Sequence, residues 1–543
     1  MFRSFIRLFL FPLVFYLFLF LLLTFPAILK FSTYIFADGG DGLQNYWNLW
    51  WVNKAIIQLH QNPWFTTYIH YPYGVTLIGH SLNIFNGLLG VILLRFLTLT
   101  QTYNFIVIFS FVMAGLTMFL LSLYLTKSHV GSLIAGYIFT FSSFHFAHLD
   151  GGQLNLISLE WIPLFILCWF LFIQKPTIFK AFISAFVLFL VILCDYYFFF
   201  YCVLLGFIMF LWFGIFKKQK RYFLKKENLT LFILFVFIVA LSSGILVSML
   251  IYANITDPFY GIQPAMFFSA DLLGLFIPGA HWRFSTLTAS YWMSLPGNIS
   301  ENDVYLGWSV IIMLIYVWVK RKKLRFSQRS FFFAVILIFF IFSLGPVLHI
   351  WGRETMIALP YTILWFLVPL LNLSDVPSRM VIIVVFSSAI LFAAGIKDLL
   401  SKGGKFRIFG IFLVAFLIGE YLPKPITLTQ VAVPEYIYQL RNLPNIGGVL
   451  EIDETTDPSS LPMYYQTIHN KPIAFGYISR IPESVKGRDD YLEQLIQQKD
   501  WRLIYYVYDM RYVIFTDKYA DCHLETLKLK NKDVKLYKLE PCF

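Results

Sequence analysis

The stretch LFLFPLVFYLFLFLLLTFPAIL (8–29), with ADGGDG (37–42) close behind it, decides the fold of this chain. The first stretch has no charged side chain and is long enough to cross a bilayer as one helix, which takes about 20 apolar residues. The second places two carboxylates, Asp38 and Asp41, among three glycines. Because glycine allows positive φ and sharp bends, we expect this loop to aim a carboxylate at a bound molecule.

Apolar stretches recur along most of the 543 residues. The chain is 59% hydrophobic and 13% charged, about half the charged fraction of a soluble domain. We therefore expect an all-α polytopic membrane protein with about 11–13 transmembrane helices. A shorter apolar piece, 356–371, is interrupted by prolines and could be re-entrant. The candidate spans are 8–29, 83–99, 103–126, 130–147, 155–173, 179–194, 196–216, 229–252, 304–320, 329–351, 376–397 and 406–423.

The first apolar stretch follows Arg3 and Arg7, a start that signal peptides and retained anchors share. A signal peptide has a shorter apolar core and a small-residue cleavage site, which residues 35–39 resemble only faintly. We expect a retained anchor with a cytoplasmic N-terminus.

The net charge of +12 is concentrated in three short loops between apolar stretches, at 217–226, 320–329 and 397–407. Such loops face the cytoplasm in multi-pass proteins, and there is no basic footprint of a nucleic-acid-binding protein. The same rule places the first outer loop, 30–82, and the C-terminal segment, 425–543, outside the cytoplasm. We expect a multi-pass protein of the plasma membrane.

An odd number of crossings must separate the first outer loop from the basic loop at 217–226, yet six apolar stretches lie between them. We expect 83–99 not to cross, because it carries two asparagines and an arginine and could lie in the interface. Under this choice the segments around 145–154 and Asp195 also face outward.

Residues 1–424 are thus expected to form a multi-pass membrane domain, and 425–543 is much more polar. Strand-like and helical stretches alternate in this tail, which predicts a small extracytoplasmic α/β domain. Cys522 and Cys542 could form a disulfide there or remain thiols. Strands are expected at 448–452, 512–516 and 534–539, and helices at 434–441 and 490–499.

Nearly every polar stretch of the hydrophobic part falls on one expected side of the membrane. A catalytic or binding site at the outer membrane surface would have this distribution. The stretches are ADGGDG (37–42), YPYG (71–74), HFAHLDGGQLN (145–155), DYY (195–197), SADLLG (269–274), ENDVYLG (301–307) and SDVPSR (374–379).

The acidic loop is followed at 43–61 by aromatic and aliphatic residues at helical spacing, which predicts a helix lying flat in the membrane interface. Asp41 would either act on a bound molecule or cap the first amides of this helix. Asp38 is expected to face solvent.

His145, His148, Asp150 and Gln153 crowd one short window. The two histidines are three residues apart and could share a helix face, but the spacing fixes no third metal ligand. A divalent metal is therefore possible but not predicted. The window is either a loop that hydrogen-bonds a polar ligand or a solvated turn between two helices.

Asp195 and Tyr196 lie between two apolar stretches, where an ionisable group is costly and suggests a function. The alternative is a tight outward hairpin loop. Asp271, Glu301 and Asp303 belong to an outer loop and could line a cleft or be ordinary surface.

Arg379 opens the apolar stretch 376–397, and Arg283 and Arg353 are also expected outside, near the membrane. A guanidinium fork can bind two phosphate oxygens. Arg379 could therefore hold a phosphate, or it could anchor the helix in the interface or pair with Asp375.

The order of these features resembles the membrane glycosyltransferases of the GT-C fold. These include the dolichyl-phosphate-mannose protein mannosyltransferases and bacterial enzymes that transfer sugars from polyprenyl phosphate. The chain is also similar to a subgroup of bacterial and archaeal multi-pass proteins, over roughly residues 1–425 and into the tail. The stretches that carry the resemblance are GDGLQNYWNLWW (40–51), YPYGVTL (71–77), AHLDGGQLNLISLEWIPL (147–164), SADLLGLFIPG (269–279), YLGW (305–308), FSLGP (342–346), DVPSRM (375–380) and MYYQTIHNKPIAFGYISR (463–480).

The resemblance implies that an aspartate of the first outer loop is the general base, a role that falls on Asp41, with Asp38 as the alternative. It would take the proton of an acceptor hydroxyl or amine during an inverting attack on the anomeric carbon. The lipid phosphate is a good leaving group, so one carboxylate and phosphate-binding cations can suffice without a metal. The acidic pair of the protein mannosyltransferases is adjacent, whereas two glycines separate the acids here.

We therefore expect a glycosyltransferase that moves a sugar from a polyprenyl-phosphate donor to a glycan, lipid or protein acceptor. Arg379 and Arg283 would hold phosphate, while the 145–153 window, Asp195, Tyr196 and Glu301 would contact donor or acceptor. The alternative is a non-enzymatic membrane protein for lipid or polysaccharide transport or envelope assembly. A transporter would place ionisable groups at mid-membrane in broken helices, so the expected gathering at one surface favours the enzyme.

Overall fold

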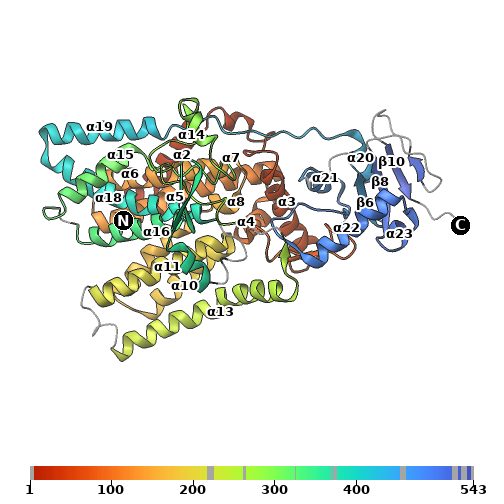
Figure 1. Ribbon diagram of the computed structural model, residues 1–543, viewed down its shortest axis with the longest axis horizontal. Helices are drawn as coiled ribbons and strands as arrows, with labels where there is room; N and C mark the ends of the chain where they lie inside the picture. Colours follow the sequence, from red (N-terminus) through yellow and green to blue (C-terminus); the bar gives the residue numbers. More distant parts are fainter. Residues whose placement is uncertain are drawn as a thin grey trace. The chain divides into compact units, whose positions relative to one another are not determined.

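The computed structural model describes residues 5–216, 225–260, 264–324, 326–368, 371, 376–452, 460–515, 524–527 and 535–539 (Figure 1). The chain forms two compact units. The helical unit takes Met1–Phe31, Asn104–Val247 and Gln263–Thr427, and the mixed unit takes Ser32–Tyr103, Ser248–Ile262 and Leu428–Phe543. The mixed unit thus joins the C-terminal segment to the first outer loop. The expected domain boundary at 424/425 separates these two parts of the chain.

The expected polytopic helical membrane protein is confirmed. Six helical stretches of the described residues are long and apolar enough to cross a membrane: Ile6–Leu23, Leu99–Thr126, His129–Asp150, Tyr196–Gly214, Lys226–Thr256 and Pro377–Lys402. In chain order the main helices of the bundle are α2 (Phe11–Leu23), α5 (Leu99–Thr126), α6 (His129–Thr140), α7 (Ser143–Asp150), α8 (Leu154–Ile157), α9 (Trp161–Gln174), α10 (Ile178–Cys194), α11 (Tyr196–Leu211), α13 (Lys226–Thr256), α15 (Trp308–Val319), α16 (Arg329–Ser343), α18 (Val381–Lys402) and α19 (Gly404–Glu420).

Helix α18 is the central helix of the bundle. It packs against α6, α15 and α16, and 94% of its apolar window is buried, against 17% for the first apolar helix. Small residues allow this packing: a Cβ on Gly395 would lie 2.3 Å from the sulfur of Met313 on α15. Because α18 is held on several sides, the side chains at its two ends have well-defined surroundings.

The two ends of α18 differ in chemistry. At its C-terminal end Lys397 donates through Nζ to the carbonyl oxygen of Thr126, 2.7 Å away at the end of α5. At the other end Arg379 lies in a short 3-10 turn, Pro377–Met380, that leads into the helix. The helix has 22 residues, so the ends are about 33 Å apart, about the thickness of a bilayer core.

Several expected span boundaries are wrong. The stretch 329–351 is helical only to Ser343, because Gly345, with φ of 72°, turns the chain into an antiparallel hairpin of β4 (Val347–Ile350) and β5 (Arg353–Ala358). The re-entrant piece expected at 356–371 holds the end of β5 and the short helix α17 (Tyr361–Leu367).

Two other stretches are shorter than a full span. The stretch 155–173 is divided between α8 and the 14-residue α9. At 83–99 the helix α4 (Ile84–Leu93) has only 10 residues, or about 15 Å, which is too short to cross as a helix, as expected.

The mixed unit contains the α/β structure expected of the tail. Its main sheet has the order β6-β8-β10-β9, in which β6 and β8 are parallel and the other pairs antiparallel. Buried Leu450, Val513 and Phe515 pack there with Trp501 and Ile504. The elements are β6 (Gly448–Ile452), β8 (Met510–Phe515), β9 (Leu524–Leu527), β10 (Lys535–Leu539), α20 (Glu435–Asn442), α21 (Leu461–His469), α22 (Glu483–Gln498) and α23 (Trp501–Tyr506). Short strand pairs are β1 (Phe65–Thr66) with β2 (Val75–Thr76) and β3 (Phe259–Tyr260) with β7 (Ile481–Pro482).

The helix after the acidic loop does not lie exposed in an interface, and that expectation is wrong. Helix α3 (Asp41–Asn53) is buried on nearly all sides and packs against α4 and α21. Trp47 stacks on Trp51 at 5.8 Å and donates through Nε1 to Gln466 Oε1, 2.6 Å away on α21. The aromatic residues that suggested a membrane surface thus form the core between the first outer loop and the tail.

Some expectations fall on residues outside the described ranges. These are the basic residues at 217–224, Arg325, Asp375, and Cys522 and Cys542.

Candidate functional site

The acidic loop of the mixed unit is organised by Asp38. Its Oδ1 accepts hydrogen bonds from the backbone N–H groups of Gly40 and Gly42, at 3.1 and 3.3 Å. Helix α3 begins at Asp41, so its N-cap position is Gly40, which has no side chain to cap the helix, rather than Asp41. Asp38 is half-buried rather than fully exposed and binds the amides instead.

None of the three glycines of this loop has a positive φ. Gly42 is needed for space, since a Cβ there would lie 2.6 Å from the Cβ of Ala37. The tail of the chain fixes the loop from outside: Ser460 Oγ donates to the carbonyl of Gly40 at 2.8 Å, and Thr429 Oγ1 to that of Ala37 at 2.7 Å.

Asp41 meets a neutral hydroxyl. Tyr477, in the loop after α21, donates to Asp41 Oδ1 at 3.2 Å. Burial, and then the charge of Asp41, raise the pKa of Tyr477 well above its usual value, so it stays a protonated donor at neutral pH. Sequence reasoning assigned no role to Tyr477, although it lies within the quoted stretch 463–480.

A cluster of charges lies in the helical unit, at the end of α18 away from Lys397. Arg379 donates through Nε to both carboxylate oxygens of Glu301, at 3.0 and 3.1 Å, and through Nη2 to Oε1. Its guanidinium lies 4.8 Å from the ring centre of Tyr197. His148 Nε2 is 3.8 Å from Glu301 Oε2. Burial alone would raise the pKa of Glu301, but Arg379 and His148 outweigh it and lower that pKa.

Asp195 caps helix α11. Its Oδ1 accepts from the backbone N–H groups of Tyr197 and Phe198, at 2.8 and 3.2 Å, and its Oδ2 accepts from Asn155 Nδ2 at 2.8 Å. Tyr196, the first residue of the helix, is half-buried. This capping role explains an acidic residue at this depth without a bound ligand. The negative charge of the carboxylate also acts electrostatically on the guanidinium of Arg379.

The two histidines of the 145–153 window have different surroundings. His145 is fully buried, its two ring nitrogens lie 2.7 and 2.9 Å from the carbonyl oxygens of Thr140 and Ile157, and its ring stacks on Phe111. These contacts are those of a packing residue. His148 Nδ1 instead lies 2.5 Å from Gln153 Oε1, which turns Nε2 toward Glu301.

Asp150 belongs to a second network that the sequence did not reveal. Its Oδ2 lies 3.0 Å from Lys424 Nζ and 3.5 Å from His281 Nε2, and its Oδ1 accepts from the amide of Thr427 at 2.7 Å. His281 Nδ1 lies 3.0 Å from Asp303 Oδ2. Burial lowers the pKa of His281, but its hydrogen bonds to Asp150 and Asp303 outweigh burial and raise it.

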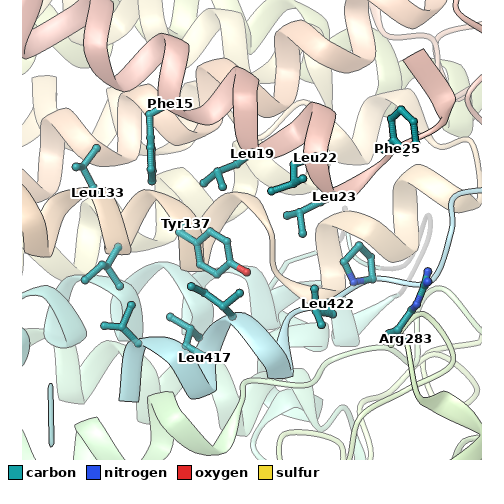
Figure 2. Close-up of a pocket in the computed structure, with 14 residues that line it drawn as sticks. Phe15, Leu19, Leu22, Leu23, Phe25, Leu133, Tyr137, Arg283, Leu417 and Leu422 are labelled. Carbon is teal, nitrogen blue, oxygen red and sulfur yellow. The ribbon is translucent and has the colours of Figure 1, made fainter. Parts of the chain in front are cut away.

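The structure thus brings His148, Gln153, Glu301 and Arg379 together and joins Asp150 to His281. Arg283 lies elsewhere in the helical unit, at one end of an apolar groove of about 640 Å³ (Figure 2). The described residues contain no group of three His, Cys, Asp or Glu side chains that could hold a metal ion.

The sequence matches no protein-family model and no curated protein. Its fold is that of solved GT-C membrane glycosyltransferases. The chain is similar to the oligosaccharyltransferase AglB from Archaeoglobus fulgidus, solved with an inhibitory peptide and a dolichol-phosphate, at 11% identity and a TM-score of 0.50, over 94% of this chain and 69% of that one. It is also similar to the arabinofuranosyltransferase AftD from Mycobacteria, at 13% identity and a TM-score of 0.57. That match covers 98% of this chain but only 40% of AftD.

Proposed function

We propose that this protein is a membrane glycosyltransferase that moves a sugar from a polyprenyl-phosphate donor to an extracytoplasmic glycan, lipid or protein. The observation that carries the proposal is the acidic loop after the first apolar helix, in a chain with the GT-C fold. Support for the lipid donor comes from AglB, which was solved with a dolichol-phosphate.

Asp41 is the general base of the proposed reaction. It takes the proton of the acceptor hydroxyl or amine as that group attacks the anomeric carbon, and the lipid phosphate leaves from the opposite side with its electron pair. Asp38 is the weaker candidate, because its Oδ1 already accepts hydrogen bonds from two backbone amides and so holds the loop in shape. Tyr477 positions Asp41 by donating to Oδ1.

Arg379 is the better candidate for the donor phosphate. Glu301 occupies its Nε and Nη2, so the two N–H groups of Nη1 can still bind a phosphate oxygen. His148, which lies 3.8 Å from Glu301, and its partner Gln153 would contact the sugar or the acceptor, and Asp195 adds negative charge that acts on the guanidinium. Glu301 thus holds Arg379 in place, and its charge limits the affinity for phosphate so that the product can leave.

The proposed orientation puts the N-terminus in the cytoplasm and the charge cluster at the outer membrane surface. The separation of charged residues along α18 supports this orientation. Lys397 and Lys402 lie towards its C-terminal end, and Arg379 lies just before its N-terminal end. The C-terminal segment is extracytoplasmic in this arrangement.

The test is sugar transfer by the full chain in nanodiscs, with a panel of radiolabelled polyprenyl-phosphate sugars and acceptors. We expect Asp41→Asn to slow transfer by about 10²–10⁴-fold at unchanged donor binding. The matched control is Asp490→Asn, at an exposed acid that pairs with Lys486 on α22, which should transfer at the wild-type rate. Equal transfer by Asp41→Asn and wild type would remove Asp41 as the base. Retained lipid without turnover across the panel would favour the transport or assembly alternative.

A further inference from the structure

The groove of the helical unit has the shape and lining of a site for one hydrocarbon chain. It runs between α2, α6 and α19, and apart from Tyr137 and Arg283 its lining residues are apolar (Figure 2). Phe15 and Leu23 of α2 both line it, so it follows that helix for about 12 Å. Its volume of about 640 Å³ lies within the usual range of small-molecule pockets, roughly 300–1,000 Å³.

The groove is bordered by apolar side chains that would face lipid. Leu22 and Phe25 line it and are 59% and 61% exposed, and Ile418 of α19 is 47% exposed. In a chain with this many apolar helices, such exposed residues lie in the hydrocarbon region. A lipid chain can therefore enter sideways from the bilayer.

Arg283 gives one end of the groove a positive charge. Its backbone N–H donates to the carbonyl of Leu422 at 2.9 Å, which fixes it just past the end of α19. The guanidinium is exposed, and among the described residues it has no hydrogen-bond or ion-pair partner. An unpaired guanidinium at the end of an apolar groove is complementary to a lipid phosphate.

Tyr137 places a polar atom between the two ends. Its hydroxyl is buried and has no hydrogen-bond partner among the described residues. Figure 2 shows the ring between Leu133 and Arg283, with its oxygen on the side toward Arg283. A buried hydroxyl without a partner costs free energy, so the occupant should offer an acceptor between its chain and its phosphate. The ester carbonyl of a glycerophospholipid has this position, and a polyprenyl phosphate has no such group.

We propose that this groove binds an acyl chain of an anionic glycerophospholipid of the bilayer, with the phosphate at Arg283 and an ester carbonyl at Tyr137. The sugar donor fits less well, because the lining offers no further polar side chain to recognise sugar hydroxyls. The inference does not depend on glycosyl transfer, since it concerns a lipid that stays bound.

The test measures lipid binding to the delipidated full chain in detergent by native mass spectrometry, with dioleoyl phosphatidylglycerol as the probe. We expect Arg283→Gln to bind this lipid about tenfold more weakly than wild type, the usual effect of losing one charged hydrogen bond. Arg353→Gln is the matched control, an exposed arginine on β5 outside the groove, and should bind as wild type does. Unchanged thermal unfolding of Arg283→Gln shows that its fold is intact.

A second variant tests the ester. Tyr137→Phe should weaken binding of the ester lipid but not of its ether-linked analogue, which lacks the carbonyls. Equal binding by Arg283→Gln and wild type would overturn the proposal, as would equal weakening of both lipids by Tyr137→Phe. Displacement of phosphatidylglycerol by undecaprenyl phosphate, with the same dependence on Arg283, would also overturn it and assign the groove to a polyprenyl lipid.

Discussion

The charge cluster of the helical unit and the acidic loop of the mixed unit both contain carboxylates, but they use them in opposite ways. Glu301 is buried, and its negative charge forms an ion pair with the guanidinium of Arg379 that holds this side chain in place. Asp38 and Asp41 accept from amides and a hydroxyl, which are neutral groups. A carboxylate bonded to a neutral donor is still able to take a proton, whereas one bonded to a cation is a much weaker base. The two regions therefore differ in chemistry although both are acidic.

Removing half of the buried ion pair should have the largest effect on stability. Glu301→Gln leaves Arg379 buried without its counter-charge, and we expect a loss of about 3–5 kcal/mol. Thermal unfolding in detergent, followed by the fluorescence of the tryptophans, would measure it. The double variant Glu301→Gln/Arg379→Met should recover much of this loss, and a double variant as unstable as the two single changes combined would contradict the pairing.

Removing the cap in the acidic loop should have a moderate effect. Asp38→Ala leaves the amides of Gly40 and Gly42 without their side-chain acceptor, which costs about 0.5–2 kcal/mol. Asp38→Asn keeps an acceptor oxygen at the same place and should be closer to wild type. Equal destabilisation by both variants would mean that the charge of Asp38, rather than its hydrogen bonds, organises the loop.

Removing the hydroxyl beside Asp41 should change transfer more than stability. Tyr477→Phe deletes one hydrogen bond, worth about 0.5–1.5 kcal/mol, so we expect transfer to slow by up to about tenfold. The pH profile of kcat distinguishes positioning from bulk destabilisation, because loss of a donor to the Asp41 carboxylate should shift the acidic limb to higher pH. An unchanged profile would contradict a link between Tyr477 and the base.

The smallest expected effect is a pH dependence of stability. The pKa of His281 is raised in the folded protein, so protonated His281 stabilises the fold below about pH 6.5, its unfolded value, and this gain disappears as pH rises through the folded value. The hydrogen bonds to Asp150 and Asp303 raise the pKa of His281 and so provide this stabilisation. The positive charge of Lys424 lowers that pKa and partly opposes the stabilisation. The gap in unfolding temperature between wild type and His281→Asn should therefore be largest at low pH. A gap that grows with pH would contradict the prediction.

Local patterns predicted some elements well, although several span boundaries were wrong. The β-strand expected at 448–452 is β6, with the same bounds. The polar residues of 83–99 likewise predicted that this stretch is not a full span, and its helix has only 10 residues. Such features depend on residues that are close in sequence, and the spacing of apolar and polar residues reveals them.

Partners far apart in sequence could not be predicted. Arg379 pairs with Glu301, which lies 78 positions away in the sequence and was not considered as its partner. Lys424, His281 and Asp150 come from three separate segments, so nothing local indicates that they meet. The roles of Asp38 and Asp41 depended on the backbone at Gly40, with φ of −93° and ψ of −100°, which the sequence ADGGDG does not specify.

The mixed unit consists of segments that lie far apart in the sequence, and this has a consequence during synthesis of the protein. Its first segment ends at Tyr103 and its last begins at Leu428, so the acidic loop is synthesised long before Thr429 and Ser460, which fix it. At about 5–20 residues per second, the ribosome needs roughly 15 s to 1 min to cover the intervening chain. During that time the tryptophans of α3 have no α21 to pack against, so a nascent chain that stops early presents them to chaperones and proteases. A truncated protein would therefore be recognised at its N-terminal loop rather than at its broken end.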